Sequence, residues 1–163
     1  MIEMRVAHLG IDRSTNTPVV ILREVDGDRA LPILIGAPEA TAIAMVMQGQ
    51  RAPRPLTHDL LKQVMKGLGG DLRRVVITDL RDNTYFAELF IHREDHVFQV
   101  DARPSDSIAL ALRLEAPIFT NDSVLDQAGQ SIEGLPEDGD HAAETLRAYL
   151  ERLDPQDFGR FNP

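Results

Sequence analysis

The order of strand-forming and helix-forming stretches limits this chain to few folds. Twice, three apolar segments separated by turn residues lead into a helix that starts at a proline. The two prolines, Pro38 and Pro104, lie 66 residues apart, and an additional amphipathic helix falls between the two patterns. Because most connections between the predicted strands are of hairpin length, we expect an α+β fold with a mostly antiparallel sheet. An internal duplication, inferred from this order, would make two helix N-termini face one another and bring Glu39 towards Asp101 and Asp106.

The expected elements fall into one domain followed by a tail. Strands are predicted at 4–12, 18–25, 30–35, 72–80, 84–92, 97–102 and 118–119, and helices at 38–48, 57–68, 104–115, 122–128 and 141–153. Residues 129–140 are acidic and rich in turn residues, which is typical of a linker. We therefore expect a domain at 1–130 and an acidic linker, peripheral helix and tail at 131–163.

Composition excludes several classes of site. The chain has 163 residues and no cysteine, so it has no thiolate nucleophile, no cysteine-based zinc site and no disulfide. Its start, Met-Ile-Glu-Met-Arg, does not have the pattern of a signal peptide, and no apolar run approaches membrane-spanning length. We expect a cytoplasmic protein without a membrane partner. Phosphate-binding glycine loops, HExxH pairs and nucleophile elbows are also missing.

Charge is distributed unevenly along the chain. The net charge is −9, but residues 121–163 hold ten acids against three arginines. Between residues 51 and 74 the balance is positive, with six bases against two acids. A locally basic strip on a nearly neutral body with an acidic tail is compatible with a nucleic-acid partner, which the bulk charge alone would disfavour.

The stretch from Val100 to Arg113 concentrates polar groups before an apolar helix. Two carboxylates, Asp101 and Asp106, flank Arg103 and Ser105, and from Ile108 to Leu112 every residue is apolar. In the simpler interpretation, the polar residues only cap a core helix, because first-turn oxygens can accept the free backbone N–H groups. Two carboxylates beside an arginine exceed what a cap needs, and this excess favours a functional site.

The helix at 57–68 carries a second candidate group. Its apolar stripe is formed by Leu60, Leu61, Val64, Met65 and Leu68, and His58, Lys62 and Lys66 lie on another side. That polar side is, in the simpler interpretation, a solvated face. In the functional interpretation, His58 acts as base or acid near neutral pH, with Asp59 orienting it.

Together these residues could hydrolyse a phosphodiester, which needs an activated water, neutralisation of the transition-state charge and protonation of the leaving oxygen. Carboxylates that hold Mg²⁺ or Mn²⁺ would supply the first requirement, arginines the second, and histidine or metal-bound water the third. The candidate catalytic residues are Glu39, His58, Asp59, Asp101 and Asp106; the candidate metal ligands are Glu39, Asp101 and Asp106; and the candidate substrate contacts are Arg54, Lys62, Arg103 and Ser105.

Three motifs in order resemble the bifunctional nuclease family: residues 31–40 (LPILIGAPEA), 53–61 (PRPLTHDLL) and 101–111 (DARPSDSIALA). The similarity spans about residues 4–130 and implies a compact α+β domain with DNase and RNase activity. The positions that match the motifs are Glu39, Arg54, His58, Asp59, Asp101, Arg103, Ser105 and Asp106.

Two functions of different classes follow. The first is a nuclease that acts on DNA or RNA with a divalent metal. The second is a non-catalytic binding or regulatory module that forms a homo-oligomer, which the acidic charge and the 5% aromatic content favour, since single-strand binding usually relies on aromatic stacking.

Overall fold

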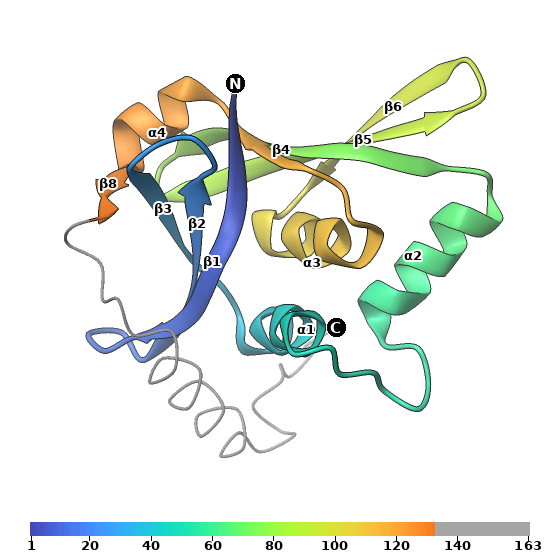
Figure 1. Ribbon diagram of the computed structural model, residues 1–163, viewed down its shortest axis with the longest axis horizontal. Coiled ribbons are helices and arrows are strands. Elements are labelled where there is room, and N and C mark those ends of the chain that lie inside the picture. The colour runs from blue at the N-terminus through green and yellow to red at the C-terminus, as the bar shows by residue number, and fades with distance from the viewer. Residues whose placement is uncertain (133–163) are drawn as a thin grey trace.

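The computed structural model describes residues 1–132 as an α+β fold (Figure 1). Within these residues the elements are, in chain order, β1 (Ile2–Asp12), β2 (Thr17–Glu24), β3 (Arg29–Leu34), α1 (Ala37–Met47), α2 (Thr57–Gly67), β4 (Asp71–Arg81), β5 (Thr84–Arg93), β6 (His96–Ala102), α3 (Pro104–Leu114), β7 (Ile118–Thr120), α4 (Asp122–Ala128) and β8 (Gln130–Ser131). The α+β class and the two β-β-β-α patterns with a helix between them are confirmed. The helix expected at 141–153 lies outside the described residues. Among the helices at 1–132, each is too short or too polar to cross a membrane.

All eight strands of this part of the chain form one sheet in the order β6-β5-β4-β7-β1-β2-β3-β8. Each pattern contributes an antiparallel three-stranded unit, and the short strand β7 joins the two units. Ile118 of β7 pairs with Met4 of β1 in antiparallel fashion and with Val75 of β4 in parallel fashion. The sheet is therefore mixed but mostly antiparallel.

Strand β8 differs from the sequence prediction, which made residues 129–140 a linker. Gln130 and Ser131 pair with Ala30 and Arg29 at the edge of the sheet. A strand of two exposed residues has no alternation of polar and apolar side chains, so nothing in the sequence distinguishes it from a loop.

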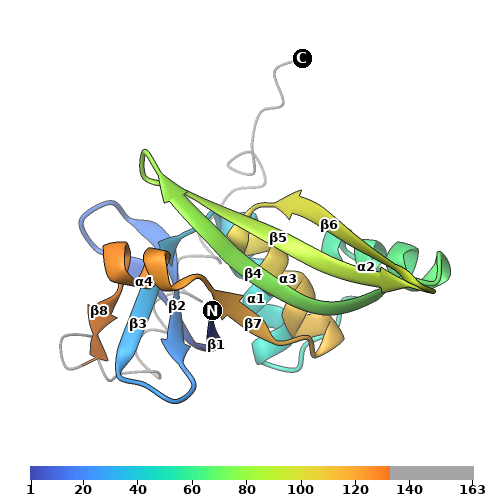
Figure 2. The same cartoon turned by 90° about the horizontal axis from the view of Figure 1, so that it is seen from above.

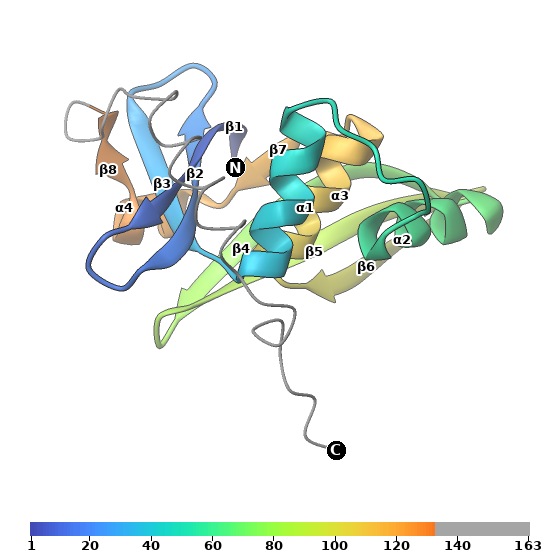
Figure 3. The ribbon, with the colours of Figure 1, turned by 90° about the horizontal axis from the view of Figure 1, so that it is seen from below.

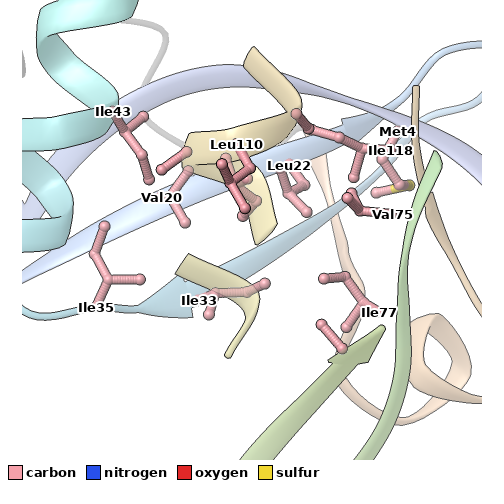
Figure 4. Packing of buried hydrophobic residues seen from close by; sticks show 14 of the residues in the cluster. Met4, Val20, Leu22, Ile33, Ile35, Ile43, Val75, Ile77, Leu110 and Ile118 are labelled. Atoms are coloured by element: carbon pink, nitrogen blue, oxygen red, sulfur yellow. The ribbon is translucent and has the colours of Figure 1, made fainter. Parts of the chain in front are cut away.

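The core lies between the curved sheet and helices α1 and α3, which lie side by side (Figures 1 and 3). Register shifts within the β4–β5 pair accompany the pronounced twist of these strands, which Figure 2 shows. Figure 4 shows side chains from both three-stranded units meeting Ile43 of α1 and Leu110 of α3. As its unbroken apolar run predicted, α3 passes through the core, with Ile108 to Ala111 at most 1% exposed.

Helix α2 is attached differently, since it lies beside α3 and away from the centre of the sheet (Figure 3). Of its apolar stripe only Met65 is buried. The other members, Leu60, Leu61, Val64 and Leu68, are 42–66% exposed. An amphipathic stripe normally covers a core, so its exposure in α2 requires an explanation.

Candidate functional site

Helix α3 begins as expected at a proline, but its polar residues do not cap it. Arg103, the N-cap residue, has extended backbone angles and makes no side-chain cap, and Pro104 is the first helical residue. The carboxylate of Asp106 instead accepts hydrogen bonds from Arg103, at 2.8 Å to Nε and 3.2 Å to NH2. The interpretation of this stretch as a simple cap is therefore wrong.

Helix α1 brings a second carboxylate to the same arginine. Glu39 lies in the first turn of α1, and its Oε1 accepts a hydrogen bond of 2.7 Å from NH2 of Arg103. Gly36 precedes that turn, and a Cβ atom at Gly36 would collide with the Glu39 carboxylate. The glycine thus leaves the space in which Glu39 reaches Arg103.

Helix α2 supplies the histidine. Nε2 of His58, in its first turn, lies 2.8 Å from Oδ1 of Asp106. Four side chains from the starts of three helices therefore form one hydrogen-bonded chain, Glu39–Arg103–Asp106–His58, which we call the Arg103 cluster. The duplicated pattern predicted that two helix N-termini face one another. In the structure, Glu39 of α1 and Asp106 of α3 bind the same arginine, Arg103.

The charged forms of Asp106 and Arg103 stabilise each other. The hydrogen bond from His58, followed by the bonds and charge of Arg103, lowers the pKa of Asp106 to about 2 despite its partial burial. Asp106 and Glu39 in turn raise the pKa of Arg103 further above its usual range. Since Asp106 is deprotonated at neutral pH, it can only accept, and so Nε2 of His58 must carry the proton of their hydrogen bond. In the neutral form of the imidazole, the other ring nitrogen, Nδ1, has the lone pair.

A buried arginine that the sequence analysis missed fixes α2 against α3. The side chain of Arg113 is 5% exposed; its Nε donates to Asp59 at 2.7 Å, and its NH1 donates to the carbonyls of Ala42 and Ala109. Lys62 donates to the carbonyl oxygen of Arg113 at 2.8 Å. An arginine in the last turn of an apolar helix is a common dipole partner, which is why the sequence did not single it out.

The comparisons with known proteins concern this same region. The sequence profile of the bifunctional nuclease domain matches residues 20–133, which include every member of the Arg103 cluster. The chain belongs to the bifunctional nuclease domain family. An uncharacterized protein of Mycobacterium tuberculosis is 42% identical over 165 residues, covering 96% of this chain and 97% of the relative.

Plant members of the family are more distant and longer. Bifunctional nuclease 1 of Oryza sativa is 26% identical over 113 residues, which is 68% of this chain and 34% of the rice protein. Bifunctional nuclease 1 of Arabidopsis thaliana is 29% identical over 108 residues, which is 64% of this chain and 33% of the relative. The segment that matches this chain thus spans about a third of each of these plant proteins.

Within this bifunctional nuclease domain, other predicted site residues have structural partners or lie outside the cluster. Asp59 accepts the backbone N–H of Leu56 as well as Arg113, and the hydrogen bond from Arg113 is the main reason that its pKa is lowered. Ser105 is 6% exposed inside the first turn of α3. Arg54 is exposed in the loop before α2, and Asp101 is exposed on β6.

The predicted basic strip is partly neutralised. Lys66 lies 2.9 Å and Arg73 3.1 Å from the two carboxylate oxygens of Asp71. Lys62 donates a hydrogen bond to the carbonyl oxygen of Arg113 on α3. Its predicted role as a substrate contact, like those of Arg54 and Ser105, stays a prediction.

The metal-binding prediction has no gathered donor set to rest on. Across residues 1–132, no three aspartate, glutamate or histidine side chains converge as metal ligands would. The guanidinium of Arg103 is bonded to both Glu39 and Asp106, so a cation would have to displace another cation. These residues as arranged do not fit a closed Mg²⁺ or Mn²⁺ centre.

Two hollows flank α2. One, of about 470 Å³, lies between α2 and β6 and is mostly apolar, with Asp101 and Asp106 among its lining residues. The other, of about 640 Å³, lies on another side of α2 and is lined by polar groups that include Arg51, Lys62 and Arg113. The Arg103 cluster thus borders the apolar groove through Asp106.

Proposed function

We propose that this bifunctional nuclease domain hydrolyses phosphodiester bonds of DNA or RNA at the Arg103 cluster. The observation that carries the proposal is the bonding of His58 and Arg103 to one carboxylate, Asp106, at 2.8 Å each. A histidine oriented by a carboxylate beside an arginine is the combination of base and phosphate-binding cation that this reaction needs. The family membership and the names of the plant relatives support the same reaction class.

Each residue has a defined part in the reaction. Asp106 holds the His58 ring through Nε2, so Nδ1 is the atom that accepts a proton from the attacking water. The water oxygen forms a bond to phosphorus, the bond from phosphorus to the leaving sugar oxygen breaks, and that oxygen takes a proton from solvent. Arg103, whose side chain is 65% exposed, meets the charge that develops on the phosphoryl oxygens. Glu39 positions Arg103 by holding NH2.

The test is hydrolysis of labelled DNA and RNA by the purified full chain, with Mg²⁺, with Mn²⁺ and with EDTA. We expect His58→Gln to lose at least about a hundredfold in rate, the usual contribution of a general base. Arg103→Lys should lose part of the activity, because lysine keeps the charge but lacks the planar bidentate fork of the guanidinium. His92→Gln and Arg13→Lys, outside the cluster, serve as matched controls and should retain full activity.

A second candidate function is supported by one specific observation. The charges of the cluster are bonded to one another, as they would be in a purely structural ion network. No activity in the unmodified chain under all three conditions would favour the non-catalytic module over the nuclease. Full hydrolytic activity in both cluster variants would show that the Arg103 cluster is not the site of hydrolysis.

A further inference from the structure

The polar hollow of about 640 Å³ beside α2 is a second cavity, and no member of the Arg103 cluster lines it. Its walls come from the last turns of α1 and α3, the first half of α2 and the loop at 48–56. Figure 3 shows this loop leaving the end of α1 and reaching the start of α2. We call the hollow the Arg113 pocket; its basic and amide lining residues are Gln50, Arg51, Lys62, Gln63 and Arg113. Its volume is in the range of cavities that bind small molecules.

Arg113 has one nitrogen left for a ligand. Its side chain is 5% exposed, and Nε and NH1 together make three hydrogen bonds, to Asp59 and to two carbonyls. Within residues 1–132, NH2 has no hydrogen-bond partner, and it is not among the fully enclosed unpaired nitrogens, which are Nε of Arg23 and Nε of Arg74. NH2 is therefore accessible, and the pocket is the hollow that Arg113 lines. A guanidinium held by three bonds is preorganised to donate its free N–H groups to an anionic oxygen.

Two further cations line the pocket. Nζ of Lys62 uses one of its three N–H groups on the carbonyl oxygen of Arg113, at 2.8 Å. Neither Lys62 nor Arg51 forms an ion pair with another residue in the range 1–132. The acids of the lining are Asp59, which is already bonded to Arg113, and Glu115. Three cations against two acids make the pocket basic in a protein whose net charge is −9.

The rest of the lining suits a ring that has a polar edge. Apolar surface comes from Met45, Val46, Pro53, Pro55 and Leu112. A methionine thioether packs favourably against aromatic rings. Gln50 and Gln63 add amide groups, each of which can both donate and accept hydrogen bonds. The pocket thus combines cations for an anion with apolar and amide groups for a heteroaromatic base.

We propose that the Arg113 pocket binds a nucleoside phosphate monoester, either as a free mononucleotide or as the 5′-phosphorylated end of a strand. A phosphate monoester has a charge of about −1.5 to −2 at neutral pH and three acceptor oxygens, whereas a diester inside a strand has one charge. Its oxygens accept from NH2 of Arg113, from Nζ of Lys62 and from Arg51. The base packs on the apolar residues and bonds through its edge to the glutamines. Binding at this pocket involves no hydrolysis, so it is independent of the function proposed for the Arg103 cluster.

The experiment is calorimetric titration of the full chain with 5′-AMP and 5′-UMP. We expect one saturable site per chain. Lys62→Gln should raise the dissociation constant at least about tenfold, the usual loss for one charge-assisted hydrogen bond, and Arg51→Gln, at an exposed residue, should raise it by a smaller factor. Arg13→Gln removes the same charge from the exposed turn between β1 and β2 and should leave the dissociation constant unchanged. Thermal denaturation checks that the variants are folded, and glutamine at position 62 retains a donor for the Arg113 carbonyl.

Inorganic phosphate and adenosine each represent one part of the ligand. We expect each to bind at least about tenfold more weakly than 5′-AMP, because each makes only some of the contacts. No saturable binding of either nucleotide at millimolar concentration overturns the proposal. Binding that both Lys62→Gln and Arg51→Gln leave unchanged overturns it as well, as does inorganic phosphate that binds as tightly as 5′-AMP.

Tetranucleotides with nuclease-resistant phosphorothioate linkages distinguish the two sources of the ligand. Displacement of 5′-AMP by the 5′-phosphorylated form alone supports the proposal with a strand end as ligand, and displacement by neither form supports it with a free mononucleotide. Equal displacement by the 5′-hydroxyl form, which has only internal linkages, overturns the monoester. A chain that binds 5′-AMP at this pocket but hydrolyses neither DNA nor RNA would refute the proposed function and leave this inference standing.

Discussion

Replacing Asp106 by asparagine tests whether the Arg103 cluster is held by charge. In the native protein this carboxylate accepts hydrogen bonds from His58 and from two nitrogens of Arg103. Asparagine has the same shape but no charge, and its nitrogen would face a donor on one side. The native Asp106 side chain is 27% exposed, so solvent screens its charge interactions only in part.

The magnitude follows from the pKa of Asp106, which falls from 3.8 to about 2 in the folded protein. A shift of that size corresponds to about 2 kcal/mol of stability at neutral pH. The folded pKa is depressed, so this contribution is present above the unfolded pKa and is lost as pH falls from about 5 towards 2. We expect Asp106→Asn to be about 2 kcal/mol less stable than the native chain at pH 7 and nearly equal to it at pH 2.

Urea denaturation of both proteins from pH 7 to the lowest pH at which the native chain folds measures this difference. Other acids with lowered pKa values, such as Asp59 and Asp71, titrate in both proteins and cancel in the comparison. A stability difference that stays constant with pH would refute the assignment of a charge-stabilised Asp106. Under the proposed function, Asp106→Asn should also lose most of its hydrolytic activity at pH 7, a pH at which we expect the variant to be folded.

Three further predictions concern the surroundings of the cluster. Arg113→Met should cost about 3 kcal/mol in urea denaturation, because it removes the ion pair with Asp59 and two hydrogen bonds to carbonyls, whereas Arg73→Met, at an exposed pair, should cost under about 1 kcal/mol. Equal costs would contradict the conclusion that Arg113 fixes α2 against α3. Gly36→Ala should displace the Glu39 carboxylate and lower the rate of hydrolysis without changing the melting temperature by more than a few degrees, and a fully active variant would show that Glu39 is dispensable. Gly67→Ala, where a Cβ meets no atom within 4 Å, is the control and should leave the rate of hydrolysis unchanged. Deleting residues 133–163, which carry eight acids and three arginines, should leave the circular dichroism spectrum of the fold intact and tighten DNA binding at low salt. Weaker DNA binding by the shortened chain at matched salt would show that the tail is not an electrostatic screen.

Much of this architecture was predictable because local signals agree with the fold. Turn residues separate the strands, and Pro38 and Pro104 mark the starts of α1 and α3. The unbroken apolar run from Ile108 to Leu112 predicted a helix that crosses the core, and four of its five residues are fully buried. Local patterns of this kind determine the elements, and hairpin-length connections then limit their order to a mostly antiparallel sheet.

The site was predictable only in part, because side-chain partners depend on tertiary distances. The duplicated pattern pointed to the meeting of Glu39 and Asp106, but it contained no reason for Arg103 to lie between them. Asp59 follows His58 in sequence, yet the Asp59 side chain bonds to Arg113 whereas the His58 side chain bonds to Asp106. Adjacent residues on a helix point about 100° apart, so neighbours in sequence belong to different contacts.

The placement of α2 explains why its apolar stripe is exposed. The helix is held on α3 by polar bonds from three of its residues, His58, Asp59 and Lys62, so the side expected to be a solvated face is the side that docks. These bonds set the rotation of the helix and turn Leu61, Val64 and Leu68 towards the groove beside β6. Apolar packing alone would favour the opposite orientation, in which the stripe is buried. The polar bonds and the exposed stripe are therefore two consequences of one orientation, which is the orientation that brings His58 to Asp106.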